Sequence, residues 1–155
     1  MIPTCSASPP SANRSNAQFT ILCIEDDPAI SRLYELRLSA EGARVLCSGN
    51  GRDGYATAVR SNPDLILLDN DLPDEPGHQV LARLRSQPSL VDVPVVMLTG
   101  MDPRTMQQRV FACGVLDILS KPVNFHDLLQ QIHRLATTPR SGKSALDSKL
   151  PAGNG

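Results

Sequence analysis

One stretch of the sequence, from Pro63 to Pro73, places a carboxylate at the end of an apolar run. Residues 65–68 read Leu-Ile-Leu-Leu, and Asp69 follows them directly. A run of this kind suits a parallel strand that is buried on both faces. Such a strand delivers Asp69 to its carboxyl end, where open α/β sheets hold their sites, and a carboxylate there needs positive charge beside it.

Three other apolar runs end in groups that could complete a site around Asp69. These groups are Glu25, Asp26 and Asp27 after the first run, Thr99 after a later one, and Lys121 after the last. Clustered carboxylates repel one another and suit a hard divalent cation with oxygen ligands, usually Mg²⁺. A lysine and a hydroxyl group can hold phosphoryl oxygens. The pattern predicts phosphoryl transfer to Asp69 as the nucleophile.

The apolar runs alternate with segments of helical period, which positions the reactive groups at one edge of a sheet. We expect strands at residues 19–24, 44–47, 65–69, 93–98 and 116–119, and helices at residues 28–41, 53–61, 79–86, 103–113 and 125–136. Pro28 suits the first turn of a helix, and Asn124 suits a helix cap. Short apolar strands that alternate with amphipathic helices predict an α/β, doubly wound parallel sheet with helices on both faces. The order 2-1-3-4-5 is a common five-stranded choice.

Composition limits the classes of protein to which the chain can belong. It has 155 residues, 41% of them apolar, and a net charge of −1 without a basic run, which argues against nucleic-acid binding by this chain. No stretch reaches the roughly 18 apolar residues of a membrane helix, and the start lacks a signal-peptide pattern. Cys5, Cys23, Cys47 and Cys113 form no C-x-x-C pair, so we expect reduced thiols, small core residues at Cys23 and Cys47, and a cytoplasmic protein.

The two ends of the chain differ in composition from its centre. Residues 1–18 are rich in Ser, Pro, Ala and Asn, and residues 137–155 are rich in Ser, Pro, Gly and Lys, with no periodicity in either segment. We expect both to be flexible tails that flank one domain at residues 19–136.

Four short motifs together resemble the receiver domains of two-component response regulators, the family of the chemotaxis regulator. They are Glu25-Asp26, then Leu67-Leu68-Asp69 with Leu72-Pro73 and Gly77, then Leu98-Thr99-Gly100, and finally Ser120-Lys121-Pro122. The motifs occur in the family's order and spacing, and the resemblance covers residues 19–136. It implies a flavodoxin-like sheet.

The resemblance also implies a role for each matching residue. Asp69 would be the phosphoacceptor, and Thr99 and Lys121 would bind the phosphoryl group. A Mg²⁺ ion would be held by Asp69 and Asp26 directly, by Glu25 through a water molecule, and by the backbone carbonyl of Asp71. Lys121 and Pro122 would be joined by a cis peptide bond.

As a family member the chain would be a phosphorylated signalling switch rather than an enzyme, with only limited self-phosphorylation and self-dephosphorylation. The phosphoryl donor would be a sensor histidine kinase or a histidine phosphotransfer protein. The output surface would be the fourth helix, fifth strand and fifth helix, lined by Gln107, Gln108, Arg109, Gln130 and Gln131 beside the Phe111, Val115 and Leu116 region. The effector, homodimer formation, the phosphoryl lifetime, and whether the receiver stands alone or belongs to a longer regulator or hybrid kinase are open.

The sequence departs from the family pattern at three places. Ile118 replaces the usual aromatic residue that moves with the threonine, which puts that coupling in doubt. An acid stands at Asp71, and this position, together with Met101, tunes self-dephosphorylation in the family. Gly100 replaces the more usual alanine, which keeps the site open to the donor.

Two other function classes and several residues stay open at this point. Ile118 is compatible with a phosphorylation-independent interaction module on the same fold. The Asp69-x-Asp71 pair would also suit a Mg²⁺-dependent phosphohydrolase, although the chain is short and lacks a cap. Asp27 either caps the first helix or supports the metal, and the three histidines are expected to be solvated or partly packed, these being His78, His126 and His133.

Overall fold

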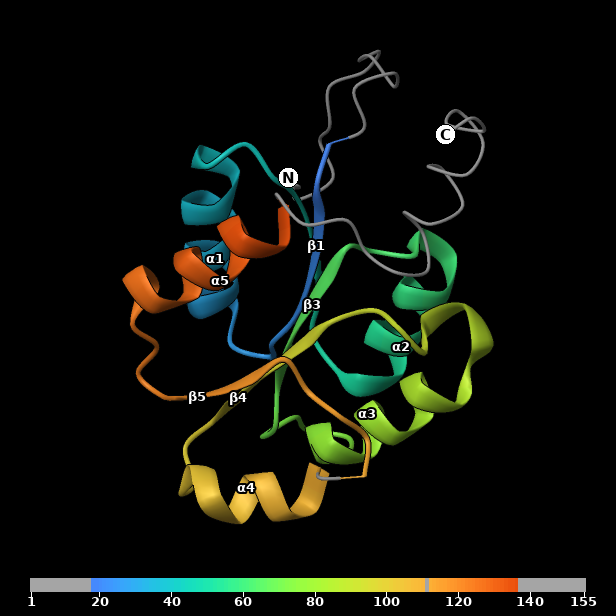
Figure 1. Ribbon diagram of the computed structural model, residues 1–155. Coiled ribbons are helices and arrows are strands. Elements are labelled where there is room, and N and C mark those ends of the chain that lie inside the picture. Colours follow the sequence, from blue (N-terminus) through green and yellow to red (C-terminus); the bar gives the residue numbers. More distant parts are fainter. Residues whose placement is uncertain (1–17, 111, 137–155) are drawn as a thin grey trace, which may run out of the picture. The chain divides into compact units, whose positions relative to one another are not determined.

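The computed structural model describes residues 18–110 and 112–136, and Figure 1 shows their arrangement. Residues 1–17 and 137–155, which contain nearly all of the two expected tails and Cys5, lie outside the described residues, as does Phe111. Within the described segments, no helix combines the length and the apolarity that crossing a membrane requires.

Five parallel strands form one sheet in the order β2-β1-β3-β4-β5, as the sequence predicts. The strands are β1 Thr20–Ile24, β2 Arg44–Ser48, β3 Leu65–Asp69, β4 Val95–Thr99 and β5 Asp117–Ser120. The helices are α1 Pro28–Ala40, α2 Gly51–Ser61, α3 Gly77–Ser86, α4 Pro103–Val110 and α5 Phe125–Ala136, with a short 3₁₀ helix, η1, at Pro88–Leu90.

The sheet is covered on both faces. Helix α1 lies on one face, and α2 and α3 lie on the other (Figure 1). The main hydrophobic core joins the second group of helices to the sheet; its fully buried members include Ile66, Leu68, Val80, Leu84 and Met106. Every residue of β3 and of β4 is buried, as expected for central parallel strands. Full burial stabilises each leucine by roughly 1.5–3 kcal/mol, which holds the two strands firmly.

The chain divides into two compact units, one that ends at Pro122 and one that begins at Val123. The first unit holds the sheet and helices α1 to α4. In the second unit, the Asn124 side chain accepts hydrogen bonds from the amides of His126 and Asp127 at 2.9 and 3.2 Å, which confirms Asn124 as the cap of α5.

Several element boundaries differ from those predicted. Helix α2 begins at Gly51 rather than at Asp53, because the Asn50 side chain caps it. Helix α3 begins at Gly77 rather than at residue 79. Strand β4 begins at residue 95 rather than at residue 93, and strand β5 begins at residue 117 rather than at residue 116. Helix α4 ends at Val110 rather than at residue 113. The Val110 carbonyl accepts hydrogen bonds from the amides of residues 113 and 114, which form a turn.

Gly77 lies directly against the backbone at the end of β3. A Cβ atom at this position would lie 2.8 Å from the Asn70 Cα and closer still to the Asp69 carbonyl oxygen. Because these are main-chain atoms of a buried strand end, they cannot move aside cheaply. The start of α3 is therefore packed against the residue that bears the candidate nucleophile.

We expect Gly77→Ala to lower the free energy of unfolding by about 1–3 kcal/mol, the usual cost of forcing a methyl group into a filled site. Urea denaturation followed by circular dichroism measures this change. Gly49→Ala is the matched control, since a Cβ there meets nothing within 4 Å. Equal losses of stability in the two variants would contradict the close contact.

Candidate functional site

The strand register brings the predicted site residues to one edge of the sheet. Ile24 pairs with Leu68, Asp69 pairs with Leu98, and Thr99 pairs with Ser120. The residues that follow these strands therefore leave the sheet at the same carboxyl edge. This is the edge at which the sequence predicts the reactive groups to meet.

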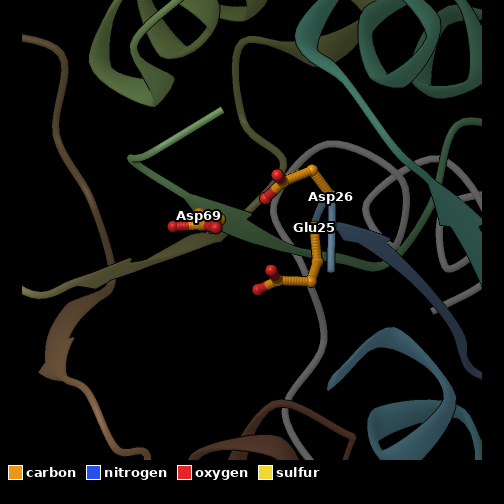
Figure 2. Close-up of side chains that lie close together, drawn as sticks. All are labelled: Glu25, Asp26 and Asp69. Atoms are coloured by element: carbon orange, nitrogen blue, oxygen red, sulfur yellow. The ribbon is translucent and has the colours of Figure 1, made fainter. Parts of the chain in front are cut away.

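Three carboxylates converge there. Oxygen atoms of Glu25, Asp26 and Asp69 all lie within 4.8 Å of one another, and Figure 2 shows the three side chains gathered at the ends of β1 and β3. Glu25 and Asp69 are only 4% and 1% exposed, whereas Asp26 is exposed at the rim. Two unit charges 4 Å apart repel by about 4 kcal/mol near a protein surface, so this cluster requires compensation.

Lys121 supplies part of that compensation. Its Nζ lies 2.8 Å from Asp69 Oδ1, and the lysine side chain is 30% exposed. Burial lowers the pKa of Lys121, but the hydrogen bond and charge of Asp69, together with the charges of Glu25 and Asp71, outweigh burial and leave the pKa raised. The backbone amide of Lys121 donates to the Thr99 carbonyl at 2.9 Å, which fixes the start of the segment after β5.

Glu25 is the least compensated member of the cluster. One carboxylate oxygen, Oε2, accepts from the Asp27 amide at 3.1 Å, while the other, Oε1, is buried and has no hydrogen-bond partner among the described residues. Burial raises the pKa of Glu25 to about 7; the charges of Asp69 and Asp26 add to this rise, and the Asp27 amide and Lys121 oppose it. A buried oxygen without a partner is an available ligand atom.

The charge balance and the ligand atoms fit a divalent cation. With all three carboxylates ionised, the single ammonium group of Lys121 leaves two uncompensated negative charges. The donors are all oxygen atoms, which Mg²⁺ prefers, and Glu25 Oε1 is unused. The acidic cluster is thus consistent with a Mg²⁺ site.

Asp27 and Asp71 lie beside this cluster without joining it by their side chains. Asp27 caps α1, because its Oδ1 accepts from the amides of Ala29 and Ile30 at 2.8 and 3.3 Å. The Asp71 amide donates to Asp69 Oδ1 at 3.0 Å. The capping alternative for Asp27 is therefore borne out, and the metal contact of the Asp71 carbonyl stays a prediction.

Thr99 is fully buried, and its Oγ1 accepts a hydrogen bond from the Met101 amide at 2.9 Å. Ile118 is partly buried and packs against the main hydrophobic core. A Cβ atom at Gly100 would meet only Asp71 Oδ2, at 4.0 Å, so the β4–α4 turn leaves open space beside Asp71. The predicted cis peptide bond between Lys121 and Pro122 is confirmed.

Asn70, the residue after the candidate nucleophile, has a positioning role that was not predicted from the sequence. Asn70 is buried, and its Oδ1 accepts from the backbone amide of His78 at 3.0 Å and lies 3.1 Å from the His78 ring Nδ1. These contacts fix the first turn of α3. Burial, and then the charge of Arg109, lower the pKa of His78. The sequence did contain one indication of this role, since Asn70 is a polar residue directly after a buried strand.

A cavity of about 520 Å³ lies next to this pair of side chains. Its lining comes from the segment between β3 and α3 and from α4, namely residues 70–76, His78 and Arg109. Glu25, Asp26 and Asp69 are not among the residues that line it. The carboxylate cluster and this cavity are therefore separate features.

Comparison with known proteins agrees with the fold and the acidic cluster. The family described as "Response regulator receiver domain" matches residues 21–133. The chain is 37% identical over 131 residues to the DNA-binding dual master transcriptional regulator RpaA of Synechocystis sp., covering 84% of this chain and 54% of that protein. The chain spans about half the length of the curated relatives that it matches.

Two solved structures illustrate the similarity in three dimensions. The Vibrio cholerae chemotaxis protein CheY4 aligns with a TM-score of 0.72 and 27% identity, over 77% of this chain and 99% of that one. The signal receiver domain of a signal transduction histidine kinase from Syntrophus aciditrophicus aligns with a TM-score of 0.68 and 32% identity, over 75% and 88%. With its flavodoxin-like sheet, its acidic cluster and a family match over most of its length, the chain belongs to the response regulator receiver domains of two-component signalling.

Proposed function

We propose that this receiver accepts a phosphoryl group onto Asp69, with Mg²⁺ bound at the acidic cluster, and thereby switches its binding to a partner. The observation that carries the proposal is the environment of Asp69, a nearly buried carboxylate paired with Lys121 and surrounded by two further carboxylates. The donor is a sensor histidine kinase or a histidine phosphotransfer protein, as is usual for receiver domains.

Asp69 acts as the nucleophile in this proposal. A carboxylate oxygen of Asp69 forms a bond to phosphorus while the bond from phosphorus to the donor's imidazole nitrogen breaks, and the donor leaves as histidine. Oδ1 is already held by the Lys121 ammonium and by the Asp71 amide. Oδ2 accepts no hydrogen bond from the described residues, which suits it to the attacking role. Two fixed donors on one oxygen orient the other toward an incoming phosphoryl group.

Glu25, Asp26, Asp69 and the Asp71 carbonyl would hold the metal ion. When bound, Mg²⁺ supplies positive charge to the phosphoryl oxygens as negative charge builds on them. Lys121, whose Nζ lies 2.8 Å from Asp69 Oδ1, would supply a second positive charge on a flexible stem. The Thr99 hydroxyl would donate to a phosphoryl oxygen, since its oxygen accepts from the Met101 amide and this leaves the O–H group to act as a donor.

The proposed output is a change in partner binding that involves α4, β5 and α5. Movement of Thr99 would be transmitted to α4 through the β4–α4 turn, and Ile118 would repack as an aliphatic side chain rather than swing as an aromatic ring. The downstream effector and homodimer formation stay open. The relative RpaA is named as a DNA-binding protein, and this chain covers about half of its length. We do not extend DNA binding to this chain.

We further propose that residues 19–136 form the receiver domain and that the protein is cytoplasmic, where a kinase domain could reach it. The family match at residues 21–133 supports this. Receiver domains are generally signalling switches and not classical enzymes, so we expect no steady turnover of a phosphoester.

Incubation with acetyl phosphate and Mg²⁺ should add one phosphoryl group to the wild-type chain, seen as a single added phosphate in the intact mass. Asp69→Ala should add none, because it lacks the nucleophile. Asp64→Ala is a control in which another aspartate at a strand end is removed. No addition to the wild type, or equal addition to Asp69→Ala, would overturn the proposal.

Lys121→Ala should destabilise the metal-free protein by about 2 kcal/mol, because the nearly buried Asp69 carboxylate loses its cation. Added Mg²⁺ should then stabilise this variant more than the wild type, since the ion takes over part of the lost compensation. Thermal unfolding with EDTA and with Mg²⁺ measures both effects. An unchanged Tm in EDTA would show that the ion pair contributes nothing.

Asp71→Ala should leave phosphorylation intact but change the rate of dephosphorylation, because the Asp71 side chain is exposed beside the nucleophile and close to the open turn at Gly100. Its backbone amide and carbonyl remain in the variant. The decay of phosphorylated protein, followed by intact mass after removal of acetyl phosphate, is the measurement. Identical decay curves for the variant and the wild type would refute this role.

A further inference from the structure

The segment between β3 and α3, residues 70–76, carries the Asp71 backbone that lies beside the nucleophile. We call this segment the β3–α3 loop. Its two ends are held close to the site. The Asp71 amide donates to Asp69 Oδ1 at 3.0 Å, and the Gly77 amide donates to the Asn70 carbonyl at 2.9 Å. The backbones of Asp71 and Pro76 also form an isolated antiparallel β-bridge. These contacts leave the middle of the loop, at Asp74, to be held by another part of the fold.

Asp74 is bound to the first residues of α2. Its Oδ1 accepts from the Gly51 amide at 2.8 Å and its Oδ2 accepts from the Arg52 amide at 3.0 Å, across 23 and 22 residues of sequence. The side-chain oxygen of Asn50, the local cap, accepts from the amide of Asp53 at 2.8 Å. The free amides of this helix end are thus shared between a local cap and a carboxylate from a distant loop.

Charge favours this contact. The amino-terminal end of a helix carries partial positive charge, and hydrogen bonds from amides to an ionised carboxylate are shorter and stronger than neutral ones. The Gly51 amide, with help from the Arg52 amide, lowers the pKa of Asp74 against the opposing effect of burial. Asp74 therefore holds its charge at neutral pH, where it acts on the helix end.

The loop also fits closely against α2. A Cβ atom at Gly51 would lie 2.7 Å from Glu75 Oε2 and from Val80 Cγ2, so a side chain there would force both of these side chains to shift. Glu75, the next loop residue, pairs with Arg83 at 2.8 Å, and the Arg83 guanidinium lies 5.0 Å from the ring centre of Tyr55 on α2. Two successive acids of the loop are therefore fixed to neighbouring helices.

We infer that Asp74 is a positioning residue for the metal site: by capping α2 from the β3–α3 loop, it holds the Asp71 backbone in place beside Asp69. The inference rests on the proposed function, because the Asp71 carbonyl is a proposed metal ligand. Asp74 itself touches neither the metal nor the phosphoryl group. Its effect reaches the site through Leu72 and Pro73, the two residues of chain between Asp71 and Asp74.

A merely structural cap would act differently. If the ends of the loop were enough to fix Asp71, loss of the Asp74 carboxylate would free the amides of Gly51 and Arg52 and change nothing at the site. If Asp74 positions the loop, the amide of Asp71 must also open more often. Outer residues that orient metal ligands change metal affinity by about 10–100-fold, so the effect is measurable.

The test compares Asp74→Ala with Asp92→Ala in the full chain. Asp92 is a matched control, since it is an exposed loop aspartate just before β4, at the opposite edge of the sheet. Amide hydrogen exchange in EDTA should be about tenfold faster at Gly51, Arg52 and Asp71 in Asp74→Ala and unchanged in Asp92→Ala. Titration with Mg²⁺ alone, followed by amide chemical shifts, should give a dissociation constant about tenfold higher for Asp74→Ala.

Asp74→Asn serves as the conservative variant. It keeps one oxygen acceptor for the helix amides without the charge, so its exchange rates and Mg²⁺ affinity should lie between those of Asp74→Ala and the wild type. In Asp74→Ala, phosphorylation by acetyl phosphate should be slower at low Mg²⁺ and approach the wild-type rate at saturating Mg²⁺, since the nucleophile and Lys121 are untouched.

Two results would overturn the inference: wild-type exchange at Asp71, or a Mg²⁺ dissociation constant within twofold of the wild type in Asp74→Ala. Neither measurement involves phosphate. Failure of the wild-type chain to take up a phosphoryl group would instead sink the proposed function and leave the exchange comparison to decide whether Asp74 holds the loop.

Discussion

A nearly buried carboxylate, that of Asp69, is the constraint on which the site depends. Removing a carboxylate from water costs several kcal/mol unless charge and hydrogen bonds replace its hydration. Lys121 and the Asp71 amide both bind one of its oxygen atoms, at 2.8 and 3.0 Å. Two more carboxylates lie within 4.8 Å of it, so with all three groups ionised the pocket carries an excess of negative charge. Protonation of Glu25, whose pKa is raised to about 7, or a bound divalent cation would each relieve this excess.

The parallel sheet supplies rigid positions for these groups. Strands β3 and β4 are buried along their whole length, and each ends in a residue of the site, Asp69 and Thr99. Glu25 follows the buried end of β1, and its amide donates to the Ser48 carbonyl of the neighbouring strand. Groups placed at the ends of packed strands keep their mutual distances far better than groups on long loops. The loops then have only to adjust the backbone around a fixed cluster.

The order of the strands and the meeting of Glu25, Asp26, Asp69 and Lys121 follow from the sequence because central parallel strands are continuous apolar runs with their polar groups at one end. The start of α3 does not, because Asn70, which binds the His78 amide, lies eight residues away in the sequence. At the start of α2 the cap Asn50 is local, but Asp74, which binds the first two amides, comes from a distant loop. A pattern along the chain contains no record of such distant partners. Helix α1 shows another limit, since its period is apolar but Leu33 and Leu36 are 41% and 53% exposed, and only Tyr34 and Leu38 are buried.

The two sides of the pocket are held by different kinds of contact. On the β3–α3 side, the loop is tied to α2 through the amides of Gly51 and Arg52, and a side chain at Gly51 would force the side chains of Glu75 and Val80 to shift. On the β4–α4 side, the Thr99 oxygen accepts from the Met101 amide two residues away, and the neighbouring Gly100 has open space around it. The Thr99 contact stays within its own turn, whereas the bonds of Asp74 join the loop to another helix. A change at Thr99 would therefore act first on the β4–α4 turn, while a change at Asp74 would also act on the start of α2.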